Sequence, residues 1–250
     1  MKPFKEAKTK GTSPPFFYKK GCGPTSLARY QTNKLVILCH LSDELIITDQ
    51  TGKTLRTIKK SKEGIAIFHP NDCISDGEGG VYLTAPGHFD KKLQPMGLIF
   101  YLSKEGIVTK IAENLIYPNG IAIYKKELYV SEHLAKRVIK YPLLRRGKIG
   151  KKKLFTDFKN ASSFRNRDPE YTGPDGIEIS KNGTIYIAEY ARGRIYVYGT
   201  DGTYKKSLHT GLPFVTNMTL DKSETSLVIT GAKSLNSFLQ FGEVYIRSLK

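Results

Sequence analysis

Two stretches of the sequence open alike: YPNGIAIYKKELYVSEH, residues 117–133, and GPDGIEISKNGTIYIAEY, residues 173–190. In each, the second residue is Pro, followed by Asn or Asp and then Gly-Ile, and a polar turn leads into an apolar strand that ends near a Glu. A pattern that returns along a chain indicates a repeat architecture. The number of such units, and the change from Asn119 to Asp175 between them, are therefore the first features to explain.

The same pattern can be followed along most of the chain. Units open at Gly23, Pro70, Pro118, Pro174 and Val215, and a period of roughly 40–55 residues is typical of propeller blades. Within a unit, two apolar strands flank a polar turn, a third strand follows a basic loop, and a Gly turn leads to a weak fourth strand. Four antiparallel strands joined by tight turns form one blade, so the sequence predicts an all-β chain folded as a β-propeller.

Five four-stranded units are legible, and the ring is expected to contain five or six blades. Because the chain ends on a third strand, a strand from the basic N-terminal segment, residues 1–20, is expected to close the last blade; the best strand pattern in that segment is PPFFYKK at Pro14–Lys20. Residues 21–250 are predicted to form a single propeller domain, with an insertion loop at residues 159–172.

The composition allows a folded core and indicates no membrane segment. Of 250 residues, 39% are hydrophobic, which is enough to bury a core. No apolar run approaches a membrane span, and the basic N-terminus lacks the apolar region of a signal peptide, so a cytoplasmic protein is expected. Cys22, Cys39 and Cys73 show no C-x-x-C spacing, and their odd number indicates free thiols in a reducing compartment or buried core residues.

The chain is strongly basic, with 40 Lys and Arg against 23 Asp and Glu and a net charge of +17. Such a charge favours an anionic partner, or it reflects a lysine-rich solvated surface. The basic residues are scattered, and RNP-type, zinc-finger and helix-turn-helix patterns are absent, so we expect no nucleic-acid partner. A monomer is expected, and a basic surface that binds an acidic partner stays open as an alternative.

The residues that open the inner strands are the candidate site. Inner strands of a propeller converge on its axis, so their first residues should lie at one rim of the channel. Asn71, Asn119, Asp175 and Asn217 are expected at equivalent points of four units. A hard divalent cation prefers such oxygen ligands. The alternative is that Asn and Asp before Gly are turn residues, selected for local hydrogen bonds.

Four further residues are candidates. Glu132 and Glu189 end second strands close to the candidate ligands in sequence, and alternation does not decide whether they face the channel. His69 and Arg192 could belong to a basic rim that attracts anionic substrates, although a single His is also well explained as a hydrogen-bonded structural residue. The other histidines lack metal-ligand spacing, and neither a G-x-S-x-G elbow nor a P-loop is present.

Four stretches in order, HPNDCISDGEGGVYLT, YPNGIAIYKKELYVSE, GPDGIEISKNGTIYIAEYARGRIYVY and TNMTLDKSETSLVITG, resemble the gluconolactonase / senescence marker protein / luciferin-regenerating enzyme family of six-bladed propellers. The resemblance implies one divalent cation (Ca, Zn, Mg or Mn) at the mouth of the channel and hydrolysis of lactones there. It implies that Asn119 and Asp175 are metal ligands and that Asn71, with His69 beside it, binds substrate. Asp175 would also be the catalytic proton acceptor.

The sequence departs from the family pattern at two acids. The family has a metal-ligand Glu in an opening Glu-Gly-Pro of its first blade, whereas Cys22-Gly23-Pro24 stands here and is followed by residues that fit the family's second blade better. Thr84-Ala85-Pro86 replaces a frequent Thr-Asp-Pro. A cation should therefore be held weakly unless another acid contributes.

Two functions follow. The first is a divalent-metal-dependent lactone hydrolase of the carboxylic-ester hydrolase class, acting on a lactone or a sugar-acid-like substrate. The alternative is a catalytically inactive propeller that serves as a ligand- or protein-binding module.

Overall fold

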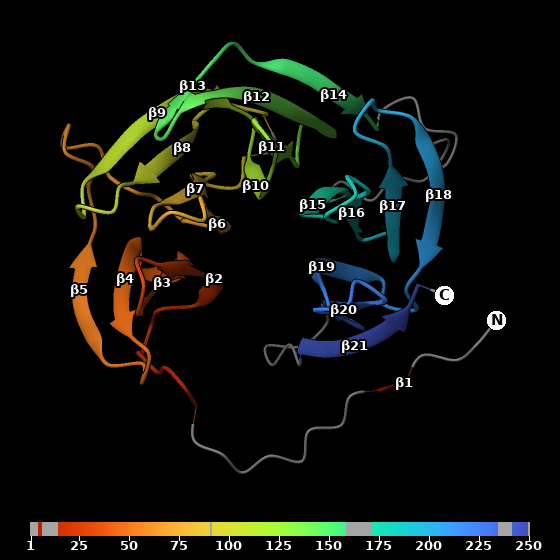
Figure 1. Cartoon of the computed structure of the whole chain (residues 1–250), viewed down its shortest axis with the longest axis horizontal. Helices are drawn as coiled ribbons and strands as arrows, with labels where there is room; N and C mark the ends of the chain where they lie inside the picture. Colours follow the sequence, from red (N-terminus) through yellow and green to blue (C-terminus); the bar gives the residue numbers. More distant parts are fainter. Residues whose placement is uncertain (1–4, 7–14, 91, 159–171, 235–241, 250) are drawn as a thin grey trace.

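The computed structural model describes residues 5–6, 15–90, 92–158, 172–234 and 242–249. Five antiparallel sheets stand around a central axis, which confirms the predicted all-β propeller (Figure 1). Across the described residues the helical content is a single 3₁₀ turn at His40–Ser42, and it contains no helix with the length and apolar character needed to cross a membrane.

Each blade is built from four strands that follow one another outward from the axis. The first blade contains β2 (Pro24–Tyr30), β3 (Lys34–Cys39), β4 (Glu44–Asp49) and β5 (Thr54–Ile58). The second contains β6 (Cys73–Ser75), β7 (Val81–Ala85), β8 (Gly97–Leu102) and β9 (Val108–Leu115). The third contains β10 (Pro118–Tyr124), β11 (Glu127–Glu132), β12 (Arg137–Arg145) and β14 (Lys153–Asp157), and the short β13 (Lys148–Ile149) also pairs with β12.

The fourth blade contains β15 (Gly173–Ile179), β16 (Ile185–Tyr190), β17 (Arg194–Tyr198) and β18 (Tyr204–His209). The fifth contains β19 (Phe214–Leu220), β20 (Ser226–Ala232), β21 (Gly242–Ser248) and β1 (Lys5–Glu6). The antiparallel pairing of β1 with β21 confirms that an N-terminal strand completes the last blade. The predicted position of this strand was wrong, because residues 15–20 of the predicted stretch form no strand and the pairing residues are Lys5–Glu6. Of the expected insertion loop, residues 159–171 lie outside the described part of the chain.

Apolar faces join each blade to the next. Between the first and second blades, Val36 and Leu38 belong to one buried cluster with Leu83 and Phe100. Comparable clusters join the second blade to the third, the third to the fourth and the fourth to the fifth. Burial of each large apolar side chain contributes about 1.5–3 kcal/mol, so these clusters hold the blades together. Among the described residues no buried cluster joins the fifth blade to the first, and the ring is open there (Figure 1).

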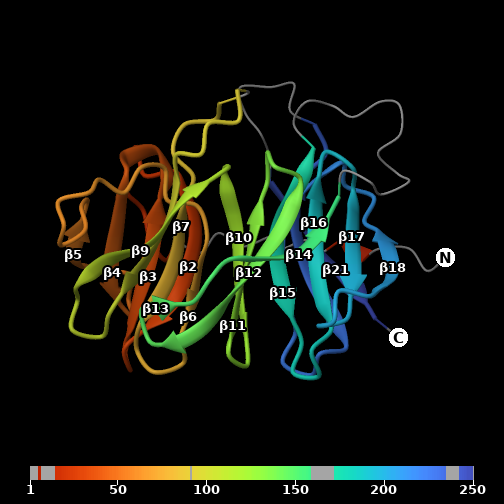
Figure 2. The ribbon, with the colours of Figure 1, turned by 90° about the horizontal axis from the view of Figure 1, so that it is seen from above.

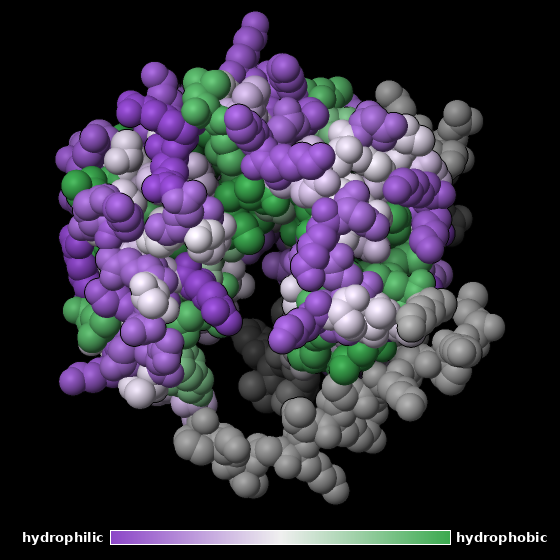
Figure 3. All heavy atoms as spheres, in the orientation of Figure 1, coloured by the Kyte–Doolittle hydropathy of each residue, from purple (hydrophilic) through white to green (hydrophobic). Residues whose placement is uncertain are grey.

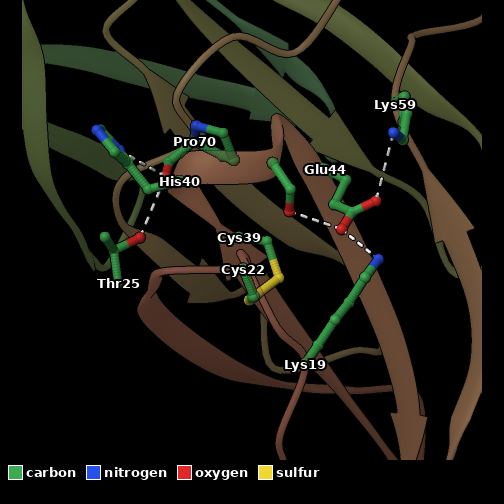
Figure 4. Close-up of a disulfide and its surroundings, with 9 residues drawn as sticks. Lys19, Cys22, Thr25, Cys39, His40, Glu44, Lys59 and Pro70 are labelled. Atoms are coloured by element: carbon green, nitrogen blue, oxygen red, sulfur yellow. Dashed lines mark hydrogen bonds and ion pairs between the residues drawn. A yellow bond between two sulfur atoms is a disulfide. The ribbon is translucent and has the colours of Figure 1, made fainter.

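The first blade covers its unpartnered face with the N-terminal segment. Ile37, Cys39 and Ile46 form a small cluster with Cys22, and Phe17 packs against it. Side chains alternate along a strand, so these residues point away from the second blade, toward which Val36 and Leu38 are directed. Cys22 and Cys39 are joined by a disulfide (Figure 4).

The disulfide corrects the expected state of the cysteines. Free thiols were the wrong expectation for Cys22 and Cys39, because the fold brings their Cα atoms to 4.5 Å across 17 residues of sequence. Both residues are nevertheless buried, as the core interpretation predicts. Cys73 is free and buried, in agreement with the core interpretation. Since disulfides are rare in reducing compartments, the cytoplasmic location stays an untested prediction.

An ion pair beside the disulfide fixes the same segment. Glu44 on β4 is almost fully buried and forms an ion pair with Lys19 (Figure 4). It also accepts a hydrogen bond from Ser42 Oγ at 2.7 Å. The segment that precedes β2 is thus held to the first blade by a covalent bond and by a charge-assisted contact.

Candidate functional site

The inner strands carry a β-bulge at the same place near the axis. In the third blade Pro118 lies opposite Glu132 and Ile121 opposite Val130, so three steps of the inner strand match two of its neighbour. The same irregularity occurs between Pro174 and Ile177, and near the start of β2 and β19. A bulge changes the direction of the side chains around it. It creates two successive positions in each blade, which we call the first and second bulge positions.

The register assigns one residue of every blade to each position. The first bulge position is occupied by Thr25, Asn119, Asp175 and Thr216. In the second blade, where β6 begins only at Cys73, the main-chain hydrogen bonds of Asn71 and Asp72 with Thr84 assign Asn71 to this position. The second bulge position is occupied by Ser26, Asp72, Gly120, Gly176 and Asn217. The expected equivalence of Asn217 with Asn119 and Asp175 is therefore wrong by one residue. The fifth unit lacks the Pro-Asx-Gly pattern, so its bulge could not be placed from the sequence.

Asp72 is a buried acid that connects three blades at the axis. Its Oδ1 accepts hydrogen bonds from Ser26 Oγ at 2.7 Å and from Cys73 N at 2.8 Å, and its Oδ2 accepts one from Ile121 N at 3.1 Å. Burial raises the pKa of Asp72, and the hydrogen bonds from Ser26, Ile121 and Cys73 oppose that rise. The sequence analysis missed this residue, whose one signal was its place after Asn71.

Asp175 is the second acid of the site. It is 8% exposed, and burial together with the negative charge of Asp72 raises the pKa of Asp175 well above its usual range. Within the described residues its carboxylate has neither a hydrogen-bond donor nor a cationic side chain as a partner. A buried carboxylate that lies near another acid is costly unless something compensates its charge.

Buried hydroxyl groups fix the main chain at the first bulge position. Thr84 Oγ1 on β7 donates to the main-chain oxygen of Asn119 at 2.7 Å. Ser131 Oγ on β11 donates to the main-chain oxygen of Asp175 at 2.7 Å. Each second strand thereby positions the inner strand of the following blade, and the side chains of Asn119 and Asp175 start from a rigid backbone.

The donor set suits a hard cation. The described residues contain no group of three His, Cys, Asp or Glu side chains that could hold a metal. A cation would therefore need amide oxygens, from Asn119 and Asn217 for example, beside the carboxylates of Asp72 and Asp175. Carboxylate and amide oxygens suit Ca²⁺, Mg²⁺ or Mn²⁺ better than Zn²⁺, which prefers nitrogen and sulfur ligands. The unpartnered Asp175 carboxylate fits such a group.

The two candidate glutamates have other surroundings. Glu132 is fully buried, and its carboxylate receives Arg137 Nε at 2.6 Å and Ile116 N at 2.8 Å. It serves as a structural ion pair between neighbouring segments. Glu189 is fully buried too, and neither of its carboxylate oxygens has a hydrogen bond of good geometry, although the Tyr196 hydroxyl approaches it. Burial raises the pKa of Glu189 to about 7.

Arg192 and His69 lie at the same end of the blades as the bulges. Arg192 is half-buried on the turn from β16 to β17, where its main-chain N–H donates to the main-chain oxygen of Glu189. His69 precedes the second inner strand, and its N–H donates to Asp43 Oδ1 at 2.7 Å. His69 has a φ of 50° and Tyr117, in the same place of the next blade, a φ of 52°. Such values are strained for residues other than Gly, and strain of this kind clusters at functional sites.

A series of rings lies on the turns at the end of the blades where the inner strands begin. We call it the aromatic collar; its members are His40, His69, His88, Phe89, Tyr117, His133, Tyr190 and Phe214. Neighbouring rings within the series contact at centroid distances such as 4.7 Å for His40 and His69 and 5.4 Å for Tyr190 and Phe214. The long connection from β7 to β8, which carries His88, rises above this end (Figure 2).

The collar stands close to Asp175. Burial, and then the charge of Asp175, raise the pKa of Tyr117 to about 12. The pKa of Tyr190 is raised by the same two causes. The structure thus brings Asp72, Asn119 and Asp175 together near the rings of Tyr117 and Tyr190.

Comparison with known proteins identifies the family and the fold of the chain. Residues 9–233 match the family model described as the SMP-30/Gluconolactonase/LRE-like region. Diisopropyl-fluorophosphatase of Loligo vulgaris is 25% identical over 175 residues, which are 65% of this chain and 53% of that protein. Lactonase drp35 of Staphylococcus epidermidis is 26% identical over 193 residues, 72% of this chain and 54% of that protein. The chain thus spans about half the length of these relatives.

Solved structures share the fold. A gluconolactonase of Xanthomonas campestris superposes with a TM-score of 0.66 at 20% identity, over 87% of this chain and 69% of that one. The calcium-binding protein regucalcin of Agrobacterium tumefaciens gives a TM-score of 0.68 at 21% identity, over 89% of this chain and 75% of that one. At these identities the likeness concerns the propeller alone, whereas the family model covers most of the sequence. The chain belongs to the SMP-30/gluconolactonase/LRE-like family.

Proposed function

We propose that the protein is a divalent-cation-dependent hydrolase of lactones, acting at the collared end of the channel. The observation that carries the proposal is the buried Asp175 carboxylate, which lies near Asp72 without a compensating partner in the described residues. Membership of the family and the lactonase among the relatives support the reaction class.

The cation would be held by oxygen atoms of Asn119 and Asp175, with Asp72 supplying a second negative charge. Asp72 would thus compensate for the first-blade Glu that the sequence lacks, and hydrogen bonds from Ser26 and Ile121 keep its carboxylate in place. When bound, the cation polarises an ester carbonyl and lowers the pKa of a water molecule.

The chain's own residues position the substrate and move the proton. Because burial and Asp72 raise the pKa of Asp175, its carboxylate accepts a proton more readily than an exposed aspartate does. Asn71 and His69, which open the second inner strand, would contact the substrate at the rim. The collar above Asp175 would restrict the access of bulk water to the ester.

Hydrolysis of a lactone panel by the purified protein tests this proposal. After treatment with EDTA, activity should be low, and it should return with Ca²⁺, Mg²⁺ or Mn²⁺. Asp175→Asn should lower kcat at least about 100-fold, because it removes a charged ligand and the proton acceptor. Asp201→Asn, an exposed turn residue of the same blade, is the matched control and should keep full activity.

The inactive binding module predicts a different outcome. It would hydrolyse none of the lactones, and it does not require a bound cation; the absence of the first-blade Glu is the observation in its favour. A protein that neither binds a divalent cation nor hydrolyses any lactone would contradict the hydrolase and would favour this module.

A further inference from the structure

A pocket lies beside the axis, in the opening between the first and fifth blades. Its volume is about 560 Å³, within the usual range of small-molecule sites. Apolar side chains such as Phe16, Leu27, Ile37 and Val228 line it. None of the described residues that line it is charged, although 25% of the chain is. Seen along the axis, the molecule is hollowed at its centre (Figure 3).

The two walls of the pocket are sheet faces that no neighbouring blade covers. On one side Leu27 of β2 lies opposite Ile37 of β3, and Leu27 is 57% exposed. On the other side Val228 of β20 lies opposite Ile246 of β21, which is 44% exposed. Exposed apolar surface of this kind, gathered around a cavity, is typical of a ligand site.

The segment that carries Phe16 and Phe17 forms a further wall of the pocket, and this wall is ordered before any ligand binds. Phe17 packs against the cluster that contains the Cys22–Cys39 disulfide, and Phe16 lines the pocket next to it. Lys19, two residues further on, forms the ion pair with buried Glu44. A wall that is already ordered binds a ligand without the entropic cost of ordering side chains.

The polar end of the pocket adjoins the axial site through Ser26 and Asn217. Ser26 lines the pocket and donates to Asp72 Oδ1 at 2.7 Å. Asn217 lines it as well, and its amide lies so close to Gly176 that a Cβ there would be 2.2 Å from Asn217 Oδ1. A ligand with a polar head at Asp72 could therefore place an apolar tail in the pocket.

We propose that this pocket binds the alkyl chain of the substrate, and that the substrates are lactones with an uncharged aliphatic side chain rather than sugar-acid lactones. The inference rests on the proposed function for the place of the lactone ring. The mostly apolar surface of the pocket disfavours both a charged tail and the hydroxyl-rich side chain of a sugar-acid lactone, because burying such groups without partners is costly.

Binding of non-hydrolysable γ-lactams with side chains of zero, three and six carbons, measured by calorimetry in the presence of Ca²⁺, tests the proposal. The affinity should rise about fourfold for each buried methylene group. Leu27→Gln should flatten this dependence, and its fold should be kept because Leu27 is exposed. Leu154→Gln, on the outer strand β14 with 58% exposure, is the matched control and should bind like the wild type.

Affinity that is independent of chain length, or a Leu27→Gln variant that binds like the wild type, would overturn the pocket. A wild-type oligomer in sedimentation that Leu27→Gln dissociates would also overturn it, because a second copy would then cover this face. The proposed function fails separately. If lactam affinity rises with side-chain length while no lactone is hydrolysed, the proposed reaction is wrong and the pocket proposal stands. If short and long lactones are hydrolysed equally well, the pocket proposal is wrong and the proposed reaction stands.

Discussion

Glu189→Gln should change how the stability of the protein depends on pH. Glu189 is fully buried at the end of β16, and burial raises its pKa to about 7 from an ordinary value of 4.5. Between these two values the folded protein keeps a proton that the unfolded chain has released, so stability falls as the pH rises. The difference of 2.5 between the two values corresponds to about 3 kcal/mol, because each pKa unit is worth about 1.4 kcal/mol.

Urea unfolding at pH 4.5, 5.5, 6.5 and 8 measures this effect. Glutamine keeps the shape of the side chain and cannot ionise, so the variant should gain about 3 kcal/mol relative to the wild type between pH 4.5 and pH 8. Most of the gain should appear below pH 7, and above it the two curves should run parallel. Curves that are parallel over the whole range would refute the assignment of Glu189 as a buried acid without adequate partners.

Glu132→Gln is the matched control, since Glu132 occupies the same place in the preceding blade. There Arg137 and Ile116 N contact the carboxylate, so the charge is compensated. The substitution should cost about 2 kcal/mol at neutral pH, because it removes a charge-assisted hydrogen bond of a buried group. A stabilising effect of Glu132→Gln would contradict the structural role of this ion pair.

Two further predictions concern the scaffold around the site. Gly120→Ala should weaken Ca²⁺ binding in calorimetry and lower Tm, because the new Cβ would lie 2.2 Å from the main-chain oxygen of Asp175. Gly242→Ala is the control and should be neutral, since a Cβ at Gly242 meets no atom of the described residues within 4 Å. Equal effects of the two substitutions would contradict the close approach of Gly120 to Asp175. The double variant Cys22→Ser/Cys39→Ser should lose about 2–4 kcal/mol of stability in urea unfolding. It should also bind the six-carbon lactam more weakly than the wild type does. Unchanged lactam affinity would show that the disulfide does not order the wall of the pocket.

The repeated Pro-Asx-Gly-Ile motif could be recognised in the sequence because the geometry of the blades constrains its residue types. Gly120 and Gly176 lie against the inner strand of the following blade, where any side chain would collide. A residue-type requirement of this kind leaves a visible pattern, so the blades, their order and the pair Asn119 and Asp175 could be read from the letters.

Three other features leave no such pattern. The first is the register of the bulge, which places Asp72 and not Asn71 beside Ser26. This register is a property of the backbone, and it could not be read from the second and fifth units because they lack the Pro-Asx-Gly pattern. The disulfide depends on two segments that meet only in the folded first blade. The pocket requires a missing contact between the first and fifth blades, which no single stretch of sequence encodes.

The position of a bound cation tests the central claim most directly. In crystals soaked with Mn²⁺, an anomalous difference map should show one strong peak at the axis, within coordination distance of the Asp175 carboxylate and the Asn119 amide oxygen. The same experiment on Asp175→Asn should lose this peak. A map without a peak at the axis, or with peaks at surface carboxylates alone, would contradict the account.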